Sequence, residues 1–164
     1  MLLTANNQVE LWKDTITEAA LRSQITLTEN RSAYLVFALI RFMRQPFLLD
    51  KVIALSYLKS NQEMPRLRGE MLAETADTSL LIAGLFPERT KRLNVSSTYF
   101  IDMSQVCYHE LALVCDSLRH KGEAELYREV GDNVKDLACV LSHTRSDRNP
   151  FESFLQDISQ RILH

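Results

Sequence analysis

The stretch MLAETADTSLLIAGLFPERTKRLNVSSTYFIDMSQVCYHELALVCDSL, residues 71–118, decides the fold. It holds two long apolar-faced segments that are separated by residues 84–87 and a basic connector. Proline lacks the N–H that a helix interior needs and disfavours a helical residue before it, so we expect the first helix to end near Leu85. The stretch therefore predicts a long helical hairpin with helices over 66–85 and 98–119.

Helical spacing continues through the rest of the chain. Apolar residues recur three and four positions apart, which is typical of amphipathic helices. Residues 33–44, AYLVFALIRFMR, are apolar nearly all round and predict a central helix that other helices surround. Gly122 is expected to stop the second hairpin helix, and Asn149 to cap the last helix. The remaining predicted helices cover residues 7–24, 48–59, 123–143 and 150–163.

We therefore predict an all-α, single-domain bundle over residues 1–164, with six to seven helices around the central helix and the hairpin. The formal net charge is −2, so no overall positive field attracts nucleic acid. The longest unbroken apolar run, residues 33–40, is far shorter than the ~20 residues that span a bilayer. The chain has three cysteines, and this odd number argues against a disulfide framework. Their spacing matches no metal site. We expect a cytoplasmic protein without a membrane or nucleic-acid partner.

The common catalytic motifs are missing from the sequence. It contains no glycine-rich phosphate loop, no H-E-x-x-H and no G-x-S-x-G. None of its four histidines follows a glutamate at the spacing of di-iron bundles. We therefore expect no cofactor and no resident metal, and we favour a protein that is not an enzyme.

Glu110 breaks the apolar pattern of the second hairpin helix. At 100° per residue it falls in the middle of the apolar arc that also contains Tyr99. A buried carboxylate needs a partner, a proton or nearby water. Arg41, which is embedded in the central apolar helix, is its expected partner. These three residues form a candidate ligand-binding pocket between helices, and a structural ion pair is the alternative interpretation.

Two further groups of residues are candidates for partner binding. Arg44 shares one face of the central helix with Tyr34 and Phe37, and such mixtures of cations and aromatics are enriched at interfaces. The connector carries a small basic cluster that suits a phosphate or an acidic peptide, namely Arg89, Lys91 and Arg92. A face covered by a neighbouring helix and a solvated loop are the respective alternatives.

His109 lies between Asp102 and Asp116 on the expected polar face of its helix. A metal site would need further ligands from another helix, and a solvated polar stripe is the favoured interpretation. Cys139 is expected on the outer face of the helix over 123–143, where charged residues surround it. Its reactivity cannot be argued from the sequence.

The hairpin also carries a family resemblance. Its corner reads Gly84, Leu85, Phe86, Pro87, Glu88, and its second helix begins with Tyr99, Phe100 and Met103. In this G-[LF]-F-P-E element and the following Y-[FY]-x-x-M start, residues 67–115 resemble a family of uncharacterised bacterial all-helical proteins. The resemblance implies a cytosolic helical fold and brings no activity, substrate or catalytic residue with it.

The leading hypothesis is a non-enzymatic helical protein that binds a protein partner or assembles with itself. The alternative is a small-molecule-binding or enzymatic bundle with a site near Glu110 and Arg41. An enclosed pocket at an unpaired Glu110 would favour the ligand. A solid core with an exposed apolar patch would favour the partner.

Overall fold

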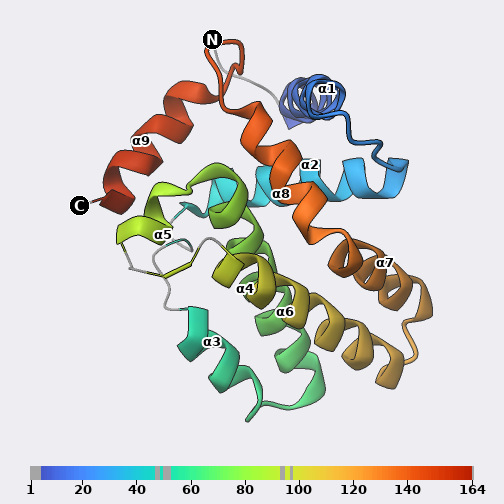
Figure 1. Cartoon of the computed structure of the whole chain (residues 1–164). Helices are drawn as coiled ribbons and strands as arrows, with labels where there is room; N and C mark the ends of the chain where they lie inside the picture. Colours follow the sequence, from blue (N-terminus) through green and yellow to red (C-terminus); the bar gives the residue numbers. More distant parts are fainter. Residues whose placement is uncertain (1–4, 47–48, 50–52, 93–94, 97, 164) are drawn as a thin grey trace.

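The computed structural model describes residues 5–46, 49, 53–92, 95–96 and 98–163, and all regular structure in these ranges is helical. No helix in the same ranges has the length and apolar character to cross a membrane. The predicted all-α class is confirmed (Figure 1). The nine helices of the described ranges are α1 Ala5–Ser23, α2 Glu29–Arg44, α3 Ile53–Ser60, α4 Pro65–Leu85, α5 Glu88–Arg92, α6 Thr98–Ser117, α7 Lys121–Asp132, α8 Val134–Thr144 and α9 Glu152–Leu163.

The predicted hairpin is formed by α4 and α6, which make the most extensive helix pair of the fold. The first helix ends at Leu85, as Pro87 predicts. Small residues let the two helices approach closely, and Ser104 Oγ donates a hydrogen bond to the backbone oxygen of Ala76 at 2.9 Å. A Cβ atom at Gly69 would already touch Val114 Cγ1 at 3.4 Å. The hairpin is therefore held by direct backbone proximity as well as by apolar burial.

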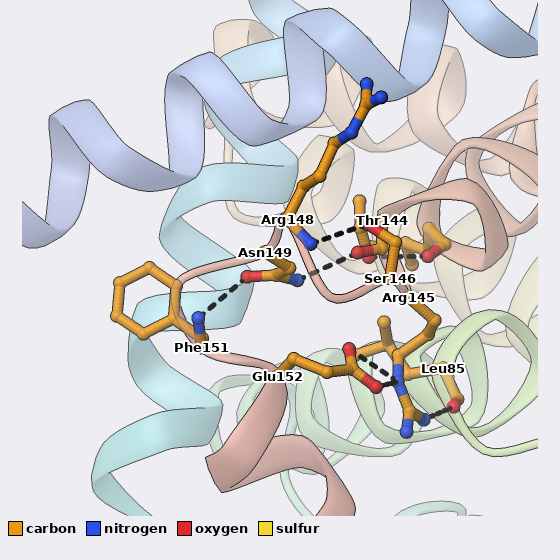
Figure 2. A network of polar contacts seen from close by, with 9 residues as sticks. Leu85, Thr144, Arg145, Ser146, Arg148, Asn149, Phe151 and Glu152 are labelled. Atoms are coloured by element: carbon orange, nitrogen blue, oxygen red, sulfur yellow. Dashed lines mark hydrogen bonds and ion pairs between the residues drawn. The ribbon is translucent and has the colours of Figure 1, made fainter.

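Arg145 ties the hairpin corner to the end of the chain (Figure 2). Its Nη1 donates to the backbone oxygen of Leu85 at 2.6 Å, and its Nε lies 3.0 Å and 3.2 Å from the two carboxylate oxygens of Glu152. The last carbonyls of a helix lack intrahelical donors, and a cation there also complements the helix dipole. One guanidinium thus joins the ends of α4, α8 and α9.

The corner itself is plugged by Phe86, which is buried against Phe42 with ring centroids 5.8 Å apart. Asn149 organises the turn before α9, as predicted. Its Oδ1 accepts from the N–H of Phe151 at 2.8 Å, and its Nδ2 donates to the backbone oxygen of Thr144 at 3.0 Å (Figure 2). Both ends of this buried amide are satisfied, so the turn has little freedom.

Two predicted boundaries are wrong. The single helix expected over 123–143 is divided into α7 and α8 at Asn133, whose side chain donates to the backbone oxygen of Glu129 at 2.7 Å. This bond offers the backbone an alternative to continuing the helix. Gly122 does not stop α6, because Arg119 adopts the left-handed conformation (φ 62°) and the N–H of His120 reaches back to Cys115.

The central helix is α2. Thr28 caps its N-terminus, because the Thr28 hydroxyl accepts from the N–H of Arg31 at 3.2 Å. One side of α2 is fully packed and contributes Leu35, Leu39 and Phe42 to the core. The other side is open, because Phe37 is 57% exposed. The expectation that other helices surround α2 therefore holds for one side only, and its open side bears on function.

Gly84→Ala should destabilise the fold. The added methyl group would lie 2.5 Å from Leu141 Cβ and 3.0 Å from the backbone oxygen of Ala138. Overpacking of this kind typically costs about 1–3 kcal/mol. Urea denaturation followed by circular dichroism should show the loss as a lower midpoint.

Gly122→Ala is the matched control, because a Cβ there meets no atom within 4 Å. Alanine has the higher helix propensity, so this variant should be as stable as the parent or more stable by up to about 1 kcal/mol. Equal midpoints for the two variants would contradict the packing argument.

Candidate functional site

A groove of about 430 Å³ lies between the open side of α2 and α4. On α4 its lining runs from Glu70 to Leu81. At 1.5 Å per residue this is roughly 16 Å of helix, or three turns. The volume falls within the range of small-ligand sites, about 300–1,000 Å³. Its floor is apolar and is formed by Ala38, Phe42, Leu49, Ala73 and Leu81.

The two walls of this α2–α4 groove carry opposite charges. Arg41 and Arg44 line it from α2. Glu70, Glu74 and Asp77 line it from α4. An apolar floor between a cationic and an anionic wall can hold a molecule that has both kinds of charge and an apolar body.

Asp77 is the centre of a hydrogen-bonded network at the groove. Its Oδ1 accepts from the hydroxyls of Tyr34 at 2.5 Å and Tyr108 at 2.6 Å. Its Oδ2 lies 2.8 Å from Arg41 Nη2. The Asp77 side chain is 15% exposed, whereas that of Arg41 is 57% exposed. The carboxylate is thus shielded, and the guanidinium that it holds faces solvent.

Burial sets the ionisation of this network. It raises the pKa of the Asp77 carboxyl above its ordinary value, even though Arg41 and the two hydroxyls favour the charged form. It also raises the pKa of Tyr34 and of Tyr108 well above the usual range for tyrosine. Both phenols therefore stay neutral donors at physiological pH.

Tyr127 completes an aromatic enclosure of the carboxylate. Its ring is nearly parallel to that of Tyr108, with centroids 6.4 Å apart, and meets Tyr34 edge-on at 6.1 Å. The network thereby joins side chains from α2, α4, α6 and α7. Because Asp77 is fixed by this network, it holds the Arg41 guanidinium in one position at the groove.

Glu110 has different partners from the predicted one. It accepts from Tyr57 Oη at 2.6 Å and pairs with Arg68 Nη2 at 3.1 Å, and its side chain is 25% exposed. The predicted Arg41–Glu110 contact and the mid-core position of Glu110 are therefore wrong. Arg68 and Asp77 are nine positions apart on α4, which at 100° per residue places them on opposite sides of the helix. Helical periodicity predicts which side of its helix Glu110 lies on, but it does not predict which helix packs against that side.

Tyr99 lies in a second hollow, on the Glu110 side of the hairpin. This hollow has a volume of about 360 Å³ and lies between α3 and α6. The structure thus divides the predicted trio between two places. Arg41 belongs to the α2–α4 groove, and Tyr99 and Glu110 belong to the opposite side. The hollow is lined by Tyr57, Ser96, Tyr99, Asp102, Met103 and Val106.

The residues predicted to bind a partner are scattered. Tyr34 is buried in the Asp77 network and cannot contact a partner, whereas Phe37 is exposed and Arg44 lines the groove. The basic cluster belongs to the short helix α5, which packs against α9, and not to a loop. Its members are Arg89, which is half-buried, and Lys91 and Arg92, which are exposed.

The predicted polar stripe on α6 is engaged by α7. His109 Nε2 lies 2.8 Å from Asp132 Oδ1, and Asp116 forms an ion pair with Arg128. Among the residues that the structure describes, no group of three or more His, Cys, Asp and Glu side chains could hold a metal ion. Cys139 is half-buried, and its Sγ lies 3.9 Å from His143 Nδ1.

Asp77 is the residue that sequence reasoning missed. At 100° per residue it shares one side of its helix with Arg66 and Glu70, which predicts a solvated polar arc. A signal was present, because Glu74 and Asp77 are the only charged residues between 72 and 85. A charge within so apolar a segment predicts a satisfied buried group.

The chain matches no protein-family model, no curated protein and no solved structure. Function is therefore inferred from the two sites described above.

The raised pKa of Asp77 predicts a characteristic pH dependence of stability. The folded protein binds a proton at Asp77 more readily than the unfolded chain, so this group favours folding at acid pH and loses that contribution as the pH rises through its folded pKa. Asp77→Asn removes the titration. The unfolding free energy of the parent relative to this variant should therefore rise as the pH falls from about 7 toward about 4.

Denaturant unfolding of the parent and of Asp77→Asn over this pH range measures the difference between their unfolding free energies. The titration of all other groups cancels from this difference to first order. A difference that stays constant, or that shrinks on acidification, would show that burial does not dominate at Asp77.

Proposed function

We propose that this chain is a non-enzymatic interaction protein that pairs with a second copy of itself. The pairing surface is the one formed by α3, the first turns of α4, and α6, and we call it the α3–α6 face. The observation that carries the proposal is a group of large apolar side chains that are exposed there, namely Leu58, Met64, Leu67, Val106 and Leu113.

These apolar side chains neighbour the polar cluster of Glu110 along their helices. Val106 and Leu113 lie one turn before and one turn after Glu110 on α6. Leu67 and Met64 lie one and four positions before its partner Arg68, and Leu58 follows its partner Tyr57 along the chain. Met64 is 79% exposed and Leu113 is 67% exposed, far more than an apolar side chain needs to be in a closed fold. Exposed apolar side chains beside a paired polar cluster are typical of a contact surface.

The polar centre of the face is ready to be covered. Glu110 accepts from both Tyr57 and Arg68, so burying the cluster leaves no unpaired charge. Tyr and Met side chains, which interfaces favour, line the adjoining hollow. The pairing of Glu110 within the chain also supports its reading as a structural group and not as a catalytic acid.

Charge complementarity selects a second copy as the occupant. The face carries the cation Arg68 beside the anion Glu110. A complementary surface must therefore place an anion opposite Arg68 and a cation opposite Glu110. A two-fold axis beside Glu110 does this by construction, because Arg68 of each protomer then faces Glu110 of the other. The same axis makes the α6 helices antiparallel and brings protruding Leu113 to the hollow beside Val106.

The family resemblance of the hairpin corner implies a cytosolic helical fold. On that resemblance we propose a bacterial cytoplasmic protein, and we propose that self-association underlies a regulatory role.

Leu113→Glu should dissociate the dimer. The side chain is exposed in the monomer, so the fold should tolerate the change, but two carboxylates would be buried at the interface. Sedimentation equilibrium at about 100 µM protein should give a dimer for the parent and a monomer for the variant. Leu21→Glu, at an equally exposed apolar residue on α1, is the control that should remain dimeric.

The register can be tested by disulfide cross-linking. Val106→Cys and Leu113→Cys proteins should cross-link faster when mixed with each other than when oxidised alone, because antiparallel pairing brings these two positions together. A monomeric parent, a dimeric Leu113→Glu variant, or no preference for the mixed pair would overturn the proposal.

A further inference from the structure

We infer that the α2–α4 groove is a binding site for a short peptide-like molecule with an apolar body, one anionic end and one cationic end. The site lies on the opposite side of α4 from the α3–α6 face, and it does not depend on self-association.

The cationic wall is preorganised. Asp77 holds Arg41 Nη2 at 2.8 Å, and the hydroxyls of Tyr34 and Tyr108 hold Asp77 in turn. Arg44 follows three positions later on the same side of α2 and has no ion-pair partner among the residues that the structure describes. Two guanidinium groups on one wall, one of them fixed from behind, form an anion site that suits a carboxylate.

The opposite wall suits a cation. Glu70 is exposed, lines the groove and forms no ion pair within the described ranges. Glu74 lies one turn further along α4 and lines the same side. An ammonium group near the Glu70 carboxylate would gain charge-assisted hydrogen bonds, while an uncharged group would gain much less.

The floor and the volume limit the size of the ligand. The floor between the walls is apolar and suits aliphatic side chains. The groove offers about 430 Å³, near the lower end of the range for small-ligand sites, and a dipeptide-sized molecule therefore fits it.

Leucyl-leucine is the probe that tests this inference. The free dipeptide carries both charges, N-acetylation removes the cation, and C-terminal amidation removes the anion. Isothermal titration calorimetry with the full chain should show that each modification weakens binding about tenfold, the usual loss for one charge-assisted hydrogen bond. No binding of the free dipeptide at about 10 mM, or equal affinity for all three forms, would overturn the inference.

Single substitutions locate the two ends. In Arg44→Gln the free dipeptide should keep less of its advantage over the amidated form, because one of the two guanidinium groups that face the carboxylate is gone. In Glu70→Gln the free and acetylated forms should bind alike. Both residues are exposed, so these changes should leave the fold intact, which thermal unfolding checks.

Arg161→Gln on α9 and Glu10→Gln on α1 are the matched controls and should keep the full discrimination. Discrimination that stays at the level of the parent in both Arg44→Gln and Glu70→Gln would place the peptide elsewhere and refute the site. Leu113→Glu should bind the dipeptide as the parent does, so this test and that of self-association can fail independently.

Discussion

The close packing of α4 is the constraint on which the rest of the structure depends. Gly69 and Gly84 bring this helix against α6 and α8, and Arg145 fixes its last carbonyl. A helix so enclosed is buried on most of its circumference and leaves only two sides for polar chemistry. One of them faces α3 and carries Arg68, and the other faces α2 and carries Asp77. The positions of both candidate sites follow from this geometry.

The two polar clusters differ in the kind of partner they suit. Glu110 is paired with side chains at the surface, and exposed apolar residues lie on either side of it along α6, so a protein surface can cover the cluster. Asp77 is shielded, and its effect reaches solvent only through Arg41. Asp77 orders the exposed Arg41 guanidinium before a ligand arrives, which lowers the entropic cost of binding. Such a preorganised group suits a small binding site better than a broad contact surface. Burial thus separates the ligand site from the interaction surface.

The sequence was sufficient for the fold class and the hairpin, because proline and helical periodicity act locally. It was insufficient for the pairing of charges. Periodicity assigned Asp77 to a polar side, but α4 is enclosed by several helices and has no simple polar side. The predicted contact between Arg41 and Glu110 rests on the fact that each interrupts an apolar pattern. Such patterns do not show which helices pack against each other. The division at Asn133 depends on one side-chain hydrogen bond that competes with the helix.

The hairpin also connects the two sites, since Tyr108 reaches Asp77 and Glu110 follows two positions later on α6. Proximity alone does not couple two sites, because coupling needs an element with two arrangements that both ligands bias. The bond from Ser104 to Ala76 and the tight contact at Gly84 fix α4 in one position. A rigid element transmits no preference, so we expect the proposed peptide site and the proposed self-association surface to act independently although α4 supports both.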